Sequence, residues 1–134
     1  NFFGPALLTK AVVPHMLRAG GGHVVVISSV QGKFGIPHRS SYAASKHAVQ
    51  GCFESLRAEH HKDGLRFLLF TPGYVATNLS RNAVTADGTP TGQLEKKGIS
   101  PSACAEQVLA AMCEGQPELY VGGQKEWAAL ALQR

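Results

Sequence analysis

The sequence predicts an α/β fold of the doubly wound type, with three parallel strands and three helices. Residues 23–28 and 65–71 are short apolar runs, the pattern of strands buried on both faces of a sheet. Residues 41–61 lie between them and show a helical pattern. Strand, helix and strand joined by short links form a right-handed crossover, so we expect the two strands to be parallel.

A helix is expected over residues 4–19, at the beginning of the chain. Pro5 suits the first turn of a helix, and Gly20, Gly21 and Gly22 would end it. Pro14 should bend this helix, because an interior proline removes a backbone donor and crowds the previous turn. The strand at residues 23–28 follows directly.

The middle of the chain continues with a loop over residues 31–40, which contains glycine and proline. The helix over residues 41–61 should end at Asp63-Gly64, and Pro72-Gly73 should end the strand over residues 65–71.

The last third of the chain begins with residues 78–100, a polar stretch containing glycine that we expect to form a mobile lobe on the substrate side. A third helix is predicted over residues 101–114 and a short final strand over residues 118–121. At 134 residues the chain is at most one domain, so we assign residues 1–134 to a single domain.

Composition excludes several classes of protein. The net charge of +4 comes from basic residues that are scattered apart from Lys96-Lys97, so nothing indicates a nucleic-acid partner. The three cysteines have no C-x-x-C spacing, which argues against a disulfide framework or a zinc site and favours a reducing compartment. No metal ligand set is predicted. The longest apolar runs fall far short of the about 20 residues of a membrane-spanning helix.

Tyr42 and Lys46 are the residues that most directly indicate chemistry. Four residues apart at the start of a helix, they lie on one face, so the lysine ammonium can sit beside the phenol. A nearby cation favours the phenolate, which would make Tyr42 a usable general acid or base. The hydroxyl of Ser29 could hold a substrate oxygen where negative charge develops.

Chance alone supplies a Tyr-x-x-x-Lys pair in about one such chain in seven. Taken alone, the pair is therefore more often the solvated start of a helix than an active site. Its position favours the active site, because ligands of open α/β sheets bind outside the carboxyl ends of the strands. Ser29 follows one predicted strand, Pro72-Gly73 follows the next, and Tyr42 begins the helix between them. Ser28 and Ser29 must face opposite sides, so only one of them can meet Tyr42.

Four segments carry a resemblance to the short-chain dehydrogenase/reductase family, in that family's order and spacing. They are Asn1-Phe2-Phe3-Gly4, Val26-Ile27-Ser28-Ser29, Tyr42-Ala43-Ala44-Ser45-Lys46 and Pro72-Gly73-Tyr74-Val75-Ala76-Thr77. The resemblance implies a Rossmann-type fold and hydride transfer between NAD(P)H and a lipid- or steroid-like carbonyl or alcohol, with the cofactor supplying the hydride chemistry.

The same resemblance implies a role for each matching residue. Tyr42 would be the acid/base, Lys46 would favour the phenolate and hold the nicotinamide ribose, and Ser29 would position the substrate oxygen. Asn1 would anchor a water that links Lys46 to solvent. The nicotinamide ring and carboxamide would be bordered by four further residues, namely Pro72, Gly73, Val75 and Thr77.

The family's glycine-rich phosphate loop is absent from these 134 residues, since Gly20-Gly21-Gly22 follows a helix and precedes a strand. The resemblance implies that the first half of the enzyme, with its first four strands, is missing. We therefore expect incomplete cofactor binding, an inactive isolated chain and an unpaired edge at residues 23–28. NADP(H) is favoured over NAD(H), although the residue that selects between them lies outside this chain.

Two functions from different classes stay open. The first is a carbonyl-reducing or alcohol-oxidising enzyme that forms a homodimer through helices 4–19 and 41–61. The alternative is a non-catalytic fragment that uses the same helices as a dimerisation or interaction module. A generic nucleotide-binding domain is disfavoured because it leaves the spacing of Ser29, Tyr42 and Lys46 unexplained. For the complete protein the resemblance allows association with the endoplasmic reticulum membrane.

Overall fold

Three parallel strands form the centre of the computed structural model, which describes residues 1–84, 87–90, 92, 98–123, 128 and 131. The strands are β1 (Gly22–Ile27), β2 (Leu65–Pro72) and β3 (Glu118–Val121), in the order β1-β2-β3. Gly22 is level with Leu65 at the start of the first pair, and Leu69 is level with Glu118 in the second. The predicted α/β fold with a parallel sheet is confirmed.

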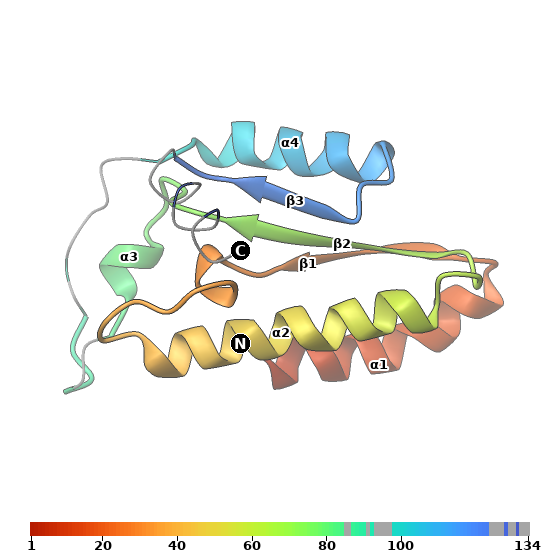
Figure 1. Ribbon diagram of the computed structural model, residues 1–134, viewed down its shortest axis with the longest axis horizontal. Coiled ribbons are helices and arrows are strands. Elements are labelled where there is room, and N and C mark those ends of the chain that lie inside the picture. Colours follow the sequence, from red (N-terminus) through yellow and green to blue (C-terminus); the bar gives the residue numbers. More distant parts are fainter. Residues whose placement is uncertain (85–86, 91, 93–97, 124–127, 129–130, 132–134) are drawn as a thin grey trace.

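Helices cover both faces of this sheet (Figure 1). Helix α1 (Phe3–Arg18) and helix α2 (Ser40–Glu59) lie side by side on one face, and helix α4 (Pro101–Cys113) lies on the other. This arrangement explains the apolar strand sequences, because a strand covered on both faces has no side exposed to water. In β2, all but Arg66 and Pro72 are fully buried.

The main core lies between the sheet and the two helices α1 and α2. It contains seven buried apolar side chains: Val13, Val26, Val49, Phe53, Leu65, Phe67 and Leu69. Phe53 and Leu69 are among the most deeply buried, and the burial of each side chain is worth about 1.5–3 kcal/mol. A smaller cluster of Phe70, Cys104 and Val121 packs under α4.

Two glycine turns meet at the amino ends of β1 and β2. Gly21 and Gly64 both have positive φ, at 135° and 74°. A Cβ on Gly21 would collide with the carbonyl oxygen of Gly64, and one on Gly64 would lie 2.8 Å from the carbonyl oxygen of Gly20. The backbone N–H of Gly22 donates to the Gly64 oxygen at 3.2 Å. Glycine is therefore needed in both turns, and their contact aligns the starts of the two strands.

Several predicted boundaries shift by one or two residues. Helix α1 begins at Phe3 and continues through Pro14, and α2 ends at Glu59 rather than at residue 61. A single 3₁₀ turn, η1 (Val30–Gly32), overlaps the beginning of the expected loop over residues 31–40. The hydroxyl of Ser29 caps this turn. None of the described helices is long and apolar enough to cross a bilayer.

The lobe predicted over residues 78–100 contains a short helix, α3 (Leu79–Asn82), which the sequence pattern did not indicate. An isolated antiparallel bridge joins Val84 to Pro90, and an isolated parallel bridge joins Val75 to Ile99. The predicted mobility of this lobe rests partly on residues 85–86, 91 and 93–97, which lie outside the described residues.

Candidate active site

The candidate site lies at the carboxyl-terminal edge of the sheet. Strands β1 and β2 end at Ile27 and Pro72, and the register places Ile27 beside Phe70. The first turns of α2 and the segment around α3 are at the same end of the molecule (Figure 1). The fold thus brings together the strand ends and the helix start that the sequence argument expected to meet.

Lys46 lies next to Tyr42, as their spacing predicts. Its ammonium nitrogen is 5.8 Å from the centroid of the tyrosine ring, within reach of a cation–π interaction. The same nitrogen donates a hydrogen bond to the backbone carbonyl of Ile27 at 2.9 Å. Both side chains are half-buried. The end of β1 therefore holds the lysine beside the phenol.

Burial lowers the pKa of Lys46 below its ordinary value, because removing an ammonium from water disfavours its charged form. The carbonyl oxygen of Ile27 partly replaces the lost water. The hydroxyl of Tyr42 makes no hydrogen bond to any residue in the described part of the chain. The phenol oxygen is thus unengaged within the part of the chain that the structure describes.

Ser29 begins the turn that follows β1. Its backbone is extended, and its hydroxyl oxygen accepts a hydrogen bond from the N–H of Gln31 at 3.2 Å. The turn η1 packs against α2, the helix that carries Tyr42. The hydroxyls of Ser29 and Tyr42, both in the described part of the chain, make no direct hydrogen bond to each other. A ligand oxygen would therefore have to lie between them.

Ser28 faces the opposite way from Ser29, as adjacent residues of an extended segment must. Its hydroxyl oxygen accepts a hydrogen bond from Nε2 of Gln50 at 3.0 Å, inside the protein. Of the two serines, Ser28 is thus engaged in the interior. This geometry supports the choice of Ser29 as the candidate that meets a substrate.

Backbone hydrogen bonds to other segments of the same chain hold the segment after β2 in place. The N–H of Gly73 donates to the carbonyl of Val121 at 2.7 Å, and the N–H of Ala76 donates to that of Ile99 at 2.9 Å. The hydroxyl of Thr77 accepts from the N–H of Leu79 at 3.3 Å. The N–H of Val75 has no partner in the described chain, so it remains available to a ligand.

Asn1 is exposed and precedes α1. No hydrogen bond in the described part of the chain joins it to Lys46, whose ammonium donates to Ile27 instead. The expected role of Asn1, which runs through a water, stays a prediction.

Comparison with known proteins identifies the family. The family model described as short chain dehydrogenase matches residues 1–88, about two thirds of the chain. The chain belongs to the short chain dehydrogenase family. It is 46% identical over 136 residues to dehydrogenase/reductase SDR family member 7B of Danio rerio, and 51% identical over 126 residues to the protein of that name from Xenopus laevis.

These alignments cover 99% and 92% of this short chain dehydrogenase but 44% and 39% of the two relatives. The chain thus spans less than half the length of the curated relatives it matches. Tyr42, Lys46, Ser29 and Pro72 all fall within the part matched by the family model, as do the remaining candidate residues.

Solved structures agree with this family. A short chain dehydrogenase from Burkholderia cenocepacia in complex with NADP superposes with a TM-score of 0.80 at 27% identity, over 98% of this chain and 50% of that one. A short-chain dehydrogenase from Streptomyces avermitilis gives 0.78 at 27% identity, over 96% and 52%. The Rossmann-type fold expected for the short chain dehydrogenase is confirmed.

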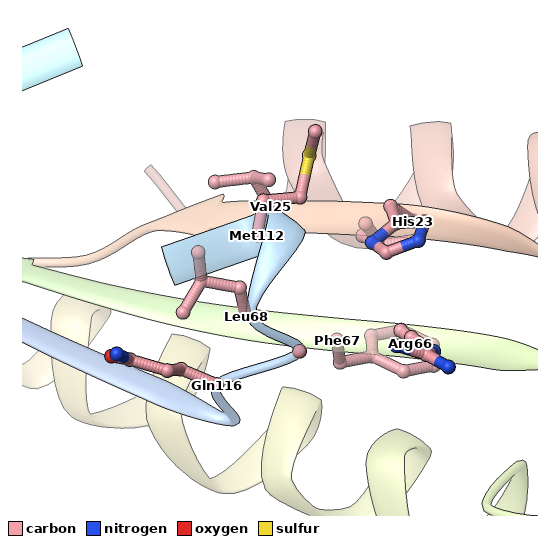
Figure 2. A pocket seen from close by; sticks show the side chains of 9 residues that line it. His23, Val25, Arg66, Phe67, Leu68, Met112 and Gln116 are labelled. Carbon is pink, nitrogen blue, oxygen red and sulfur yellow. The ribbon is translucent and has the colours of Figure 1, made fainter. Parts of the chain in front are cut away.

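A small pocket in this short chain dehydrogenase lies away from the candidate site (Figure 2). Strands β1 and β2, the end of α4 and the turn after it line the pocket, and Figure 2 shows His23 near Arg66. His23 and Arg66 are paired near the amino ends of their strands, opposite the edge that carries Tyr42. None of the candidate site residues lines this pocket.

The adjacent residues His60 and His61 both have local partners. His60 Nδ1 lies 2.7 Å from a carboxylate oxygen of Asp63, and the His60 ring stacks on Phe67. His61 Nδ1 lies 2.9 Å from the carbonyl of Ala58. Over the described residues, no group of three His, Cys, Asp or Glu side chains is arranged to hold a metal ion.

Proposed function

We propose that the protein is an oxidoreductase that interconverts a carbonyl and an alcohol with a nicotinamide cofactor. The observation that carries the proposal is the arrangement of Lys46, whose ammonium is held by the Ile27 carbonyl beside the ring of Tyr42. The tyrosine hydroxyl has no partner in the described chain. A cation beside an unengaged phenol at a strand end suits proton exchange with a substrate oxygen.

In the direction of reduction, Tyr42 donates its hydroxyl proton to the carbonyl oxygen of the substrate. The resulting phenolate is stabilised by the Lys46 ammonium and recovers a proton from solvent. Ser29 donates a hydrogen bond to the same substrate oxygen, where negative charge develops. The bound cofactor supplies the hydride that reduces the carbonyl carbon. Oxidation of an alcohol uses the same groups in reverse.

The residues present fit the nicotinamide end of such a cofactor. Tyr42 and Lys46 would hold the ribose, and the unpaired N–H of Val75 is a donor suited to the carboxamide. Pro72, Gly73 and the hydroxyl of Thr77 would border the ring. The chain contains no glycine-rich loop between a strand and a following helix that could hold the phosphates. NADP(H) is preferred to NAD(H) in this proposal, supported by two similar structures solved with NADP.

The substrate in this proposal is apolar, lipid- or steroid-like. Four large hydrophobic side chains that follow the strand ends are exposed: Ile36, Tyr74, Leu79 and Val84. Such side chains favour an apolar ligand that they can cover. Asn1 keeps its expected part in linking Lys46 to solvent through a water. The reducing compartment and the membrane association considered from the sequence stay predictions.

The proposal is tested in the longest natural polypeptide that contains these 134 residues, called the complete enzyme below. Tyr42→Phe removes the transferable proton and keeps the ring, so turnover of a steroid ketone with NADPH should fall about 10²- to 10⁴-fold. The melting temperature should change little. Tyr120→Phe is the matched control, because Tyr120 lies in β3 and its hydroxyl has no part in the proposed chemistry.

Equal turnover by Tyr42→Phe and the wild type would refute the proposed role of Tyr42. The 134-residue chain alone should not reduce the ketone, because it lacks a phosphate loop. Turnover by that chain would contradict this part of the proposal.

The second candidate function is an interaction module that dimerises through α1 and α2, and one observation favours the contact itself. Phe3, Leu7 and Leu8 on α1 are 76%, 64% and 66% exposed, a concentration of apolar surface on one helix. A homodimer through this surface is compatible with both functions. Loss of turnover with retained dimerisation in Tyr42→Phe would separate the enzyme from the module.

A further inference from the structure

A buried polar cluster lies beneath the candidate site. It consists of Ser28 at the end of β1, Gln50 on α2 and Thr71 near the end of β2, and is called the strand-end cluster here. Nε2 of Gln50 donates hydrogen bonds to the hydroxyl oxygens of Ser28 and Thr71, each at 3.0 Å. The three residues are 3%, 4% and 5% exposed. One amide group therefore ties a helix to two strand ends inside the protein.

The strand-end cluster continues the row of residues that forms the site. Tyr42, Lys46 and Gln50 are spaced by four residues and share one side of α2. Lys46 donates to the carbonyl of Ile27, and Gln50 donates to the hydroxyl of the next residue, Ser28. Two successive turns of the helix thus bind Ile27, the last residue of β1, and Ser28, the residue that follows it. A shift of α2 along the strand would break both bonds.

The turn after Ser29 packs back onto the same atoms. A Cβ placed on Gly32 would lie 2.7 Å from the hydroxyl oxygen of Ser28 and 2.9 Å from the backbone carbonyl of Lys46. The turn can approach so closely only because residue 32 is glycine. The position of Ser29 is therefore set by the same contacts that hold Lys46 and Gln50.

Stability alone does not explain Gln50. Its side-chain oxygen Oε1 is buried and has no hydrogen-bond partner in the described part of the chain. A buried polar atom without a partner is unfavourable, and an apolar side chain of similar length would avoid this cost. The directional bonds of Nε2 instead fix how the helix and the two strand ends are placed relative to one another.

We infer that Gln50 is a positioning residue for the active site. Through Ser28 it holds Ser29, and through Thr71 it holds the segment that begins at Pro72, both in register with Tyr42 and Lys46 on the same helix. Gln50 does not touch substrate or cofactor in this inference, whose catalytic consequence rests on the proposed function.

The test replaces Gln50 in the complete enzyme. Gln50→Met keeps the length of the side chain and removes both hydrogen bonds. Its kcat should fall about 10- to 100-fold, because small displacements of reacting groups have effects of this size. The KM for the cofactor should stay within about twofold. Val49→Ala is the matched control, since it creates a cavity beside Gln50 without touching the cluster, and its kcat should stay near wild type.

Two further variants cover the case in which Gln50→Met does not fold. Ser28→Ala and Thr71→Val each remove one bond and leave Gln50 in place, so each should lower kcat by a smaller factor. In the double variant Gln50→Met/Thr71→Val, kcat should be no lower than in Gln50→Met, because both changes remove the same bond. A kcat in the double variant that equals the product of the two separate losses would overturn the inference. A wild-type kcat in both Ser28→Ala and Thr71→Val, or in Gln50→Met, would also overturn it.

Hydrogen exchange separates this inference from the proposed function. If the wild-type complete enzyme reduces no carbonyl compound, the proposed function fails. The positioning role of Gln50 is then tested by amide hydrogen exchange in the peptides that cover residues 28–33 and 71–77. Faster exchange there in Gln50→Met or Thr71→Val than in Val49→Ala supports a positioning role. Equal exchange in all of these variants overturns it.

Discussion

Lys46 couples the candidate chemistry to the stability of the fold. Burial lowers the pKa of this lysine in the folded protein relative to the ordinary value of 10.5. Between the folded-state pKa and 10.5, the unfolded chain therefore binds more protons than the folded one. Stability contributed at this site therefore rises as the pH rises through that window and is constant below it.

Replacement of Lys46 by Met should remove this pH dependence. The melting temperature of the wild-type complete enzyme, taken relative to that of Lys46→Met, should increase as the pH is raised from about 7 toward 10. Lys62→Met is the control, because it removes an exposed lysine from the turn after α2. A relative melting temperature that decreases over this range would show that another effect dominates at position 46.

Gly32 is the residue at which one added methyl group should matter most. A Cβ would meet the Ser28 hydroxyl at 2.7 Å and the Lys46 carbonyl at 2.9 Å, and a backbone carbonyl within a helix cannot move aside easily. We expect Gly32→Ala to lower the free energy of unfolding by about 1–3 kcal/mol, as overpacking does elsewhere. Urea denaturation measures this change.

Gly35→Ala is the control for Gly32→Ala. Gly35 lies in the same loop and is exposed, and nothing lies within 4 Å of the position of an added Cβ. Its free energy of unfolding should stay within about 0.5 kcal/mol of wild type. Equal effects of the two substitutions would contradict the tight packing described around Gly32.

At the scale of elements, helix α4 depends on its first residues. Ser100 has an extended backbone, its hydroxyl accepts from the N–H of Ala103 at 3.2 Å, and Pro101 occupies the first turn. Loss of such an N-cap costs about 0.5–2 kcal/mol, so Ser100→Ala should lower the melting temperature.

Ser55→Ala provides the comparison for the capping prediction. Ser55 lies inside α2 and is exposed, and its hydroxyl donates to the carbonyl of Gly51. Alanine is a better helix former than serine at an interior position, so this variant should keep or slightly raise the melting temperature. A larger loss in Ser55→Ala than in Ser100→Ala would indicate that α4 is stabilised by packing alone.

The larger elements could be predicted from the sequence because their signals are local. Strand β3 was predicted at its observed bounds, and β1 and β2 to within one residue at each end, since apolar runs between glycines and prolines leave few alternatives. Helix α4 was predicted over residues 101–114 and is observed at Pro101–Cys113. The short elements η1 and α3 were missed, because three- and four-residue helices depend on single side-chain bonds and packing that no periodicity reveals.

The site could be predicted only in part. The pairing of Lys46 with Tyr42 follows from helical spacing, and the strand-end position of Ser29 follows from sheet topology. The strand-end cluster could not be predicted, because Gln50 is separated by 22 and 21 residues from Ser28 and Thr71. The available signal was a glutamine two turns after Tyr42, between Val49 and Phe53 on a buried face.

For the whole molecule, the apolar surface of α1 predicts self-association. Leu8 is 66% exposed, and glutamate there would place a charge in the proposed homodimer interface. Leu8→Glu should shift the complete enzyme from dimer to monomer in size-exclusion chromatography with light scattering. Leu109→Glu is the control, because Leu109 is 57% exposed on α4, which covers the opposite face of the sheet. A monomeric wild type would remove the basis for the dimer.

The opposite orientation of Ser28 and Ser29 sets how tolerant the chain is to changes in length. Inserting or deleting one residue within β1 would exchange the two buried hydroxyls, so that the one now bonded to Gln50 would turn toward the candidate site and the one now accepting from Gln31 would turn toward Gln50. The exposed stretch from Gly35 to Arg39 carries no such constraint, so a change in its length should leave the strand ends undisturbed. Recombination between relatives should therefore tolerate junctions in this loop and fail within the six residues of β1.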